Sequence, residues 1–562
     1  MRSLALALFV AVAPCSALAA DTATPAADAK DAAPAADENK PAPFFDGLGH
    51  VDFKITTNSP TAQLYFSQGL LLAYGFNHAE AARSFREAVK LDPTCAMGWW
   101  GIALVLGPNI NAPMEPTDNP EAWKALNKAH EFSHLASSKE QALIGALLKR
   151  YVAAAPQDRA SLDVAYADAM REVARQYPDD VDVLTLAAEA RMDTHPWDYY
   201  DRKTFEEHAW TPEIVNLLEM ALKLNPDHPG ANHFYIHAVE ASKNPERALP
   251  CAERLGKLCP GQGHLVHMPS HIYIRTGQYH DGSAVNEKAI QADDAYVASC
   301  HAQGIYPLAY RTHNHHFLWT TATFEGRSAV ALEAARHTAA LVAKEMYHDP
   351  VAGGMMQHWS CIPLFGMVRF GWWKDILLEP EPSEDLVYPR AVRHFARGLA
   401  FERTGHPKEA DAELAALREA AKDSTLKSLT ILNLNTTEAL VDIAERVLTG
   451  EIASSRGKHD EAVAALRDAV AKADGLTYDE PPDWFFPVRQ NLGAALLAAK
   501  KPAEAEAVYR EDLQLYPDNG WSLFGLEQAL SAEGKKADAA DVHKRFQKAW
   551  AAADIQLTSS RM

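Results

Sequence analysis

Five histidines lie in two adjacent stretches of the chain at spacings that fit a metal site. His233 and His237 are four residues apart, as are His267 and His271, and His264 precedes His267 by three. Residues three or four apart lie on one face of a helix. The two stretches coincide when the sequence is shifted by 34 residues, which indicates two copies of one structural unit. We therefore expect five imidazoles to point from two neighbouring helices into one space.

Such a cluster has the chemistry of a transition-metal site. Helices packed side by side have axes about 8–10 Å apart, so imidazoles at equivalent positions can meet around one ion at about 2.0–2.1 Å per bond. Imidazole ligands suit copper, zinc and iron, and also nickel. Thirteen of the 24 histidines fall between His195 and His316, about a fifth of the chain. The alternative is that the second pair was merely inherited when the unit was duplicated, but duplication does not explain His264.

The elements that must position these side chains are helices. From Gln63 onward, apolar residues recur at helical spacing and are interrupted by proline and glycine at short intervals. Small residues let paired helices approach closely, and proline ends one unit before the next begins. We predict an all-α fold, a right-handed α-solenoid of helical hairpins with loop insertions and almost no strand. Its parts are N-terminal hairpins over 61–225, central histidine-rich hairpins over 226–376 and C-terminal hairpins over 377–562.

The spacing of small and aromatic residues resembles that of the tetratricopeptide repeat (TPR) family over most of Gln63–Trp550. The residues that carry the resemblance near the start are Gly69, Ala81, Phe85, Ala88 and Pro93, and near the end Gly493, Ala505, Tyr509 and Pro517. More narrowly, HPGANHFYIHAVEAS, GHLVHMPSHIYIRTG, THNHHFLW, GPNINAPM and YDEPPDWFFPVRQ resemble a group of exported bacterial TPR proteins. In the wider family the first helix of each hairpin lines a concave groove. The resemblance therefore implies that the histidine cluster faces that groove.

Carrying the repeat register along the chain adds further candidates. It implies that the groove also receives the metal-ligand candidates His313 and His316, and the carboxylates Glu189, Asp193 and Glu240. Glu240 follows His237 by three and could be a ligand or an acceptor that orients an imidazole. Candidates for binding a non-metal ligand are Tyr273, Arg275 and Tyr310, with core packing or salt bridging as their alternative roles.

Four irregular stretches interrupt the repeats: Gly107–Pro120, Pro156–Arg159, Asp193–Thr211 and Tyr478–Pro487. Long irregular segments between repeats tend to be functional or disordered. Two of these are rich in tryptophan and tyrosine, which favours folding over the groove. The alternative is that their aromatic side chains only cap helix ends.

The N-terminus has the features of an export signal. Residues 1–19 contain an arginine, an apolar run and a small-residue ending, which is typical of a secretory signal peptide. Residues 20–60, rich in alanine, aspartate and proline at their start, are expected to form a disordered tether. No stretch has the roughly 20 apolar residues needed to span a bilayer. We expect a periplasmic or secreted protein.

Charge and cysteine content exclude several classes. The chain has 54 Lys and Arg against 74 Asp and Glu, and a net charge of −20 argues against nucleic-acid and anionic-membrane partners. There is no CxxC or CxxCH motif, which excludes a c-type haem and a zinc ribbon. The sequence therefore leaves two hypotheses. One is a transition-metal protein, with an oxidoreductase-type enzyme as an open possibility. The other is a scaffold that binds a peptide or protein in the groove.

Overall fold

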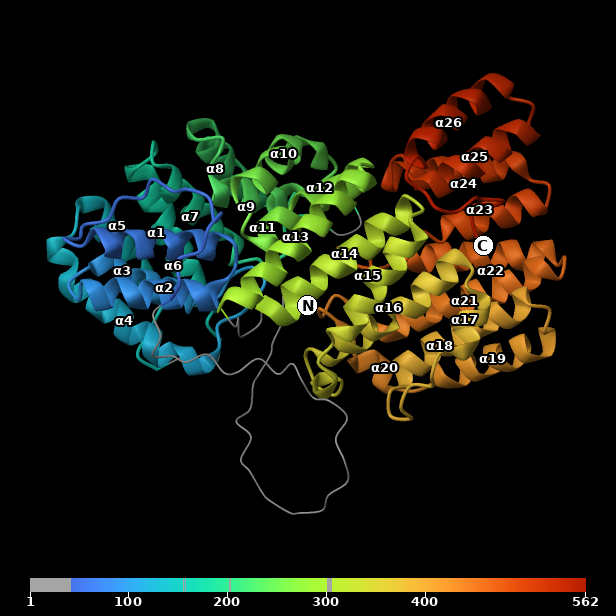
Figure 1. Cartoon of the computed structure of the whole chain (residues 1–562), viewed down its shortest axis with the longest axis horizontal. Coiled ribbons are helices and arrows are strands. Elements are labelled where there is room, and N and C mark those ends of the chain that lie inside the picture. The colour runs from blue at the N-terminus through green and yellow to red at the C-terminus, as the bar shows by residue number, and fades with distance from the viewer. Residues whose placement is uncertain (1–41, 155, 157, 202–203, 301–305) are drawn as a thin grey trace, which may run out of the picture.

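The computed structural model describes residues 42–154, 156, 158–201, 204–300 and 306–562. The fold is an all-α solenoid, as predicted (Figure 1). Within the described ranges the only named strands are β1 (Thr430–Ile431) and β2 (Asn435–Thr436), which pair antiparallel. None of the described helices is long and apolar enough to cross a bilayer. The predicted signal peptide at 1–19 lies outside the described residues.

Successive helices pack as antiparallel hairpins along the chain. The N-terminal helices are α1 (Pro60–Tyr74), α2 (His78–Leu91), α3 (Ala96–Val105), α4 (Asn119–Phe132), α5 (Ser138–Leu147), α6 (Ala160–Gln176), α7 (Val181–Met192) and α8 (Thr211–Leu224). The central helices are α9 (Pro229–Val239), α10 (Leu249–Leu258), α11 (Gly263–His267), α12 (Pro269–Thr276), α13 (Tyr279–Cys300), α14 (Arg311–Phe324), α15 (Ser328–Ala340), α16 (Gly353–Phe370) and α17 (Trp373–Leu378). The C-terminal helices are α18 (Val387–Arg403), α19 (Pro407–Ala420), α20 (Thr425–Ser428), α21 (Thr437–Ser455), α22 (His459–Ala473), α23 (Arg489–Ala498), α24 (Pro502–Leu515), α25 (Gly520–Ala532) and α26 (Lys536–Ala549).

Glycines at the predicted repeat positions allow the hairpins to pack. A Cβ added at Gly69 or Gly101 would lie 2.7 or 2.5 Å from the Phe85 ring, closer than packed atoms approach. The ring of Tyr509 stands in the same relation to Gly493 and Gly525, where the distances are 2.3 and 2.2 Å. Each ring therefore fills a space that exists only because the helices on either side carry glycine.

Part of the predicted tether packs on the helices. Residues 42–59 have no regular structure, but Phe53 is 1% exposed and Val51 is also buried. Gly261 N donates to Gly47 O at 2.8 Å, and Gln262 Nε2 donates to Leu48 O at 2.8 Å. The predicted end of the tether at residue 60 is therefore too late. Alternating apolar residues at 51–55 offset the ordering entropy that the composition of the preceding segment cannot.

The C-terminal hairpins return to the central ones. Trp521 Nε1 in α25 donates to Thr323 O in α14 at 2.9 Å, and the Asp554 carboxylate accepts from Ser328 N at 2.7 Å. In Figure 1 the red C-terminal helices stand beside the green central helices. This return brings the insertion 478–487 to the centre of the molecule.

Candidate metal centre

Six histidines form two sets of three in the central hairpins. The first triad is His233 and His237 of α9 with His264 of α11. The second triad is His267 and His271 of α11 and α12 with His313 of α14. Within each triad the three ligand nitrogens all lie within 4.8 Å of one another. The predicted cluster thus divides into two sites, and His264 belongs with the α9 pair.

The two triads adjoin and are buried. The ring centroids of His237 and His271 are 5.5 Å apart, and those of His264 and His267 are 5.9 Å apart. All of these residues except the partly buried His313 are at most 2% exposed. The cluster is therefore enclosed and is not part of an open surface.

The break between α11 and α12 keeps His267 and His271 on one face. Pro269 follows Met268, whose φ of −50° and ψ of −34° are helical. Proline has no N–H, so a hydrogen bond is lost while the helical path continues. Ligands four residues apart thus remain aligned across a proline.

Hydrogen bonds fix the tautomers of two histidines in the first triad. His233 Nδ1 lies 2.6 Å from the Tyr74 carbonyl, which can only accept, so Nδ1 carries the hydrogen and Nε2 has a free lone pair. His237 Nδ1 donates in the same way to Glu240 Oε1 at 3.1 Å, and its Nε2 has no hydrogen-bond partner. His264 Nε2 lies 3.1 Å from His233 Nε2. The Nε2 lone pairs of His233 and His237, the two histidines of α9, are therefore available to the first triad.

The second triad is built in the same way. His267 Nδ1 donates to Asn286 Oδ1 at 2.7 Å, and Asn286 Nδ2 donates to Gly282 O, which fixes the amide orientation. His271 Nδ1 donates to Glu240 Oε2 at 2.5 Å. The Nε2 atoms of His267 and His271 then face each other at 2.9 Å. Two facing lone pairs at this distance require a cation between them, either a proton or a metal ion.

Glu240 joins the two triads, since its two oxygens accept from His237 and His271. Arg275 donates from Nη1 to the Glu240 carbonyl at 2.9 Å, and its guanidinium lies 5.1 Å from the Tyr478 ring centre. Glu480 Oε2 lies 3.0 Å from His271 Nδ1. Because that N–H is already donated to Glu240, both Glu480 oxygens are left without a hydrogen bond.

Burial sets the charge of the cluster. It lowers the pKa of His233, His264, His267 and His313 well below 6.5, and also lowers that of His237. Burial opposes the charge on His271 too, but the Glu240 carboxylate outweighs it and raises the pKa to about 10. Burial also opposes the charge on Glu240, yet His271 and His237 hold the Glu240 pKa down at about 2. The metal-free cluster therefore contains neutral imidazoles and one ion pair.

Two aromatic residues with unusual backbone conformations cover the first triad. Phe76 and Trp197 have φ of 57° and 59°, a region that bulky residues rarely adopt. The Phe76 ring centroid lies 4.6 Å from that of His233, and the Trp197 centroid lies 5.0 Å from that of His237. Strained residues of this kind persist only where the surroundings hold them.

Three of the four insertions meet at the cluster. Asn111 of the first accepts from Trp197 Nε1 of the third at 3.1 Å and donates to Tyr310 Oη at 3.1 Å. The Tyr310 ring centroid lies 4.6 Å from that of His264. The last insertion contributes Glu480. Segments far apart in sequence thus close over the histidines.

Several predicted site residues lie elsewhere. His316 accepts from Trp359 Nε1 at 3.3 Å and is not one of the triad residues. Asp193 accepts from Arg150 Nη2 at 2.6 Å in a separate buried group that includes Glu189, and burial raises the pKa of Glu189 to about 8 and of Asp193 to about 7. Tyr273 packs in the core, where burial raises its pKa to about 12.

The residues that prediction missed are Phe76, Asn286, Phe317 and Glu480. Phe317 packs on the second triad, with its ring centroid 4.7 Å from that of His267. Glu480 sits in an insertion that the sequence does identify, but its contact with α12 depends on how the solenoid closes. Nothing in the sequence distinguishes Phe76 from other hairpin aromatics.

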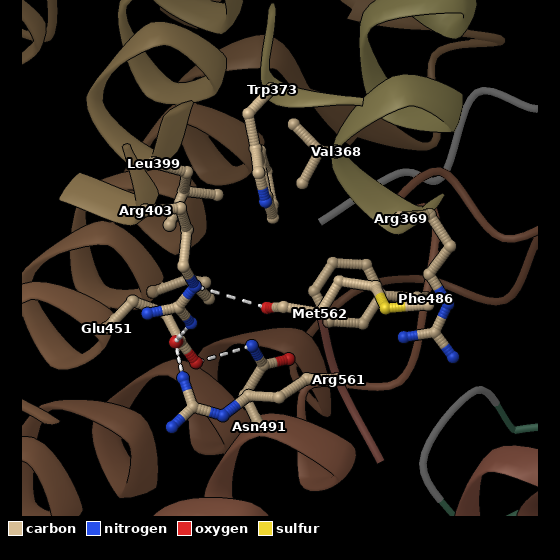
Figure 2. A pocket seen from close by; sticks show the side chains of 11 residues that line it. Val368, Arg369, Trp373, Leu399, Arg403, Glu451, Phe486, Asn491, Arg561 and Met562 are labelled. Carbon is tan, nitrogen blue, oxygen red and sulfur yellow. Dashed lines mark hydrogen bonds and ion pairs between the residues drawn. The ribbon is translucent and has the colours of Figure 1, made fainter. Parts of the chain in front are cut away.

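A second group of buried charges lines a pocket in the C-terminal hairpins (Figure 2). Arg403 and Arg561 both pair with Glu451, and the Arg369 guanidinium lies 3.6 Å from the Trp521 ring centre. Burial lowers the pKa of Arg369 and of Arg561 to about 9. Phe486 also lines this pocket, so the insertion that carries Glu480 reaches both places.

Comparison with known proteins identifies a repeat unit at the start of the solenoid. The tetratricopeptide repeat model matches residues 62–95, which include most of α1 and all of α2. No curated protein matches the sequence significantly. Among solved structures, the human IFIT1 dimer with m7Gppp-AAAA is similar at a TM-score of 0.29 and 11% identity, covering 88% of this chain and 91% of that chain. The human IFIT1 dimer with PPP-AAAA also has a TM-score of 0.29 and 11% identity, covering 85% and 88%. Likenesses at these TM-scores carry no argument about this chain.

Proposed function

We propose that this chain is an exported metalloprotein that holds two transition-metal ions, one in each triad. The observation that carries the proposal is the pair of facing nitrogens in each triad, 3.1 Å apart for His233 and His264 and 2.9 Å for His267 and His271. Two nitrogen ligands bonded to a tetrahedral ion at about 2.0–2.1 Å lie about 3.3–3.4 Å apart. A small opening of each pair would therefore admit an ion.

The surroundings of the nitrogens support the same proposal. Metal-bound histidines usually donate their other N–H to a carboxylate or a carbonyl, which orients the ring. Tyr74 O, Glu240 and Asn286 accept from four of the six histidines in this way.

The donor set narrows the choice of metal. Neither triad contains a carboxylate or a thiolate, although the Glu240 carboxylate forms a third candidate group with His237 and His271. The described cysteines Cys95, Cys251, Cys259 and Cys361 are buried, and burial raises the pKa of each thiol. Three imidazoles with an open fourth position suit copper or zinc, whereas iron sites commonly include a carboxylate.

A second candidate function is partner binding, which the tetratricopeptide match at residues 62–95 favours. Arrays of such repeats commonly bind peptides or proteins. The triad residues other than His313 are at most 2% exposed, so a bound peptide would make little contact with them. Partner binding would use other surfaces and is compatible with the metal sites.

Elemental analysis of the full-length chain, purified after export and again after reconstitution, tests the proposal. We expect about two ions per chain. The variants His237→Ala and His313→Ala should each lose one ion, because they remove one ligand from different triads. His543→Ala, an exposed histidine paired with Glu527, is the control and should keep both ions. Less than about a tenth of an equivalent after reconstitution would contradict the proposal.

A further inference from the structure

We propose that the two triads form one dinuclear copper centre whose substrate is dioxygen. This inference rests on the proposed metal sites and assigns them a metal, a joint action and a ligand. Three features carry it: the adjacency of the triads, their all-imidazole donor set, and the closed aromatic cover.

The triads are close enough for their ions to share one ligand. Two ring contacts join the triads: His237 contacts His271, and His264 contacts His267. Glu240 accepts a hydrogen from one histidine of each triad, so a single carboxylate orients ligands of both ions. Ions that act together lie about 3.5–4 Å apart in two-metal sites. His237, whose buried Nε2 has no hydrogen-bond partner, is also the residue whose ring contacts His271 of the second triad.

The donor set favours copper. Affinity of a nitrogen site for divalent first-row metals rises to a maximum at copper. Three neutral imidazoles also suit Cu(I), and the buried His233 and His267 each place Nδ1 against a fixed acceptor, which leaves Nε2 as the atom available to an ion. Hydrolytic two-metal sites need room for a polar substrate and its nucleophilic water. The enclosed triads, at most 2% exposed apart from His313, offer no such opening.

The cover selects a small uncharged molecule. Phe76, Trp197 and Phe317 pack against the imidazoles, and Tyr310 closes the side of His264. A bulky polar substrate would have to lose its hydration to pass this aromatic cover. A diatomic gas can cross a packed protein through small fluctuations.

Two copper ions and dioxygen alone account for all the electrons transferred when O2 binds. Two Cu(I) ions each give one electron to O2, which becomes peroxide bound between two Cu(II) ions. The O–O bond order falls from two to one and two Cu–O bonds form. No proton or external reductant is needed. Release of O2 reverses the same transfer.

Anaerobic loading of the full-length chain with Cu(I), followed by admission of O2, tests the inference. We expect one O2 taken up per two copper ions and an oxidised protein without a Cu(II) electron paramagnetic resonance signal, because two coupled Cu(II) spins cancel. The variant His313→Ala should show a signal from uncoupled Cu(II) and lose at least tenfold in O2 uptake. His543→Ala should behave as the unaltered chain does.

The outcomes separate the two proposals. Retention of no metal of any kind overturns the metal sites themselves. The chain could instead retain two zinc ions when zinc and copper are both offered, or two Cu(II) ions that both give an electron paramagnetic resonance signal. Either result would support the metal sites and overturn the dioxygen centre. Failure of the loaded protein to take up O2 overturns it as well.

Discussion

His267 and His271 face each other through their Nε2 atoms at 2.9 Å, while the Nδ1 hydrogen of each is donated away from the pair. In the metal-free chain the second proton of His271 lies between the two nitrogens, because Glu240 raises the pKa of His271 to about 10 against the effect of burial. A proton therefore occupies the position that we assign to a metal ion. Metal binding in this triad must displace it.

Proton release distinguishes the two triads. At pH 6 we expect Zn²⁺ binding in the second triad to release about one proton, and binding in the first triad to release fewer, since burial lowers the pKa of His233, His237 and His264. At this pH a zinc-bound water, with a pKa of about 7, stays mostly neutral. Release into a weakly buffered solution with a pH indicator measures the number.

The corresponding affinities should differ in their pH dependence. Below about pH 10 the second triad should lose tenfold in affinity per pH unit, whereas the first should hold its affinity from about pH 8 to 6. His271→Gln removes the displaced proton and should abolish the release. An equal release from both triads in the unaltered chain would contradict the assignment.

Acid should destabilise the metal-free fold through the same histidines. Burial lowers the folded-state pKa of His264 and four other triad histidines below 6.5, so the unfolded chain binds more protons as the pH falls below that value. Stability is then fully present above about pH 6.5 and declines below it, by up to about 1.4 kcal/mol per pH unit for each such group. Urea unfolding from pH 7.5 to 5 measures the slope. His264→Phe should flatten it, while His543→Ala should not.

The sequence predicted the cluster because the repeat relates equivalent positions of α9 and α11. His233 and His267 share one register position, as do His237 and His271, so their common face followed from spacing alone. His316 was misplaced because register was carried across a long connection that ends in the π-helix Tyr306–Tyr310. In the structure α14 turns His313 toward the second triad and His316 toward Trp359.

The cover could not be predicted in the same way. Glu480 meets His271 more than 200 residues away, and that contact exists only because the C-terminal hairpins return to α14. The overall curvature of the solenoid is the sum of small rotations between neighbouring hairpins. No local sequence pattern determines that sum. Phe76 of the first hairpin likewise reaches His233 because its backbone adopts a left-handed conformation. The neighbouring residues do not predict that conformation.

Trp197 should control how fast metal leaves the first triad. Its ring covers His237 and is tied to Asn111 by a hydrogen bond of 3.1 Å. We expect Trp197→Ala to speed metal transfer to a chelator about tenfold or more, with a smaller change in equilibrium affinity, because the ligands themselves are intact. Trp372→Ala is the matched control, since Trp372 is 37% exposed and Trp197 is 36% exposed. Equal exchange rates in the two variants would show that Trp197 is not the gate.

Glu480→Gln should have opposite effects on the metal-free and metal-loaded chains. Burial and the neighbouring Glu240 carboxylate raise the pKa of Glu480 from 4.5 to about 7, and His271, whose Nδ1 lies 3.0 Å from Glu480 Oε2, offsets only part of this rise. Because the folded-state pKa lies above that of the unfolded chain, ionisation of Glu480 lowers stability as the pH rises from 4.5 through 7. The amide avoids this, so the metal-free variant should be more stable than the unaltered chain at pH 8, by at most about 3 kcal/mol, and equal to it at pH 4.5.

In the loaded chain the same carboxylate offsets the charge of the ions beside His271, so the variant should bind metal in the second triad more weakly. Urea unfolding and metal competition at pH 8 measure the two effects, with the exposed Glu461→Gln as control. A variant that is less stable without metal, or that binds metal as tightly as the unaltered chain, would show that Glu480 serves the fold and not the ions.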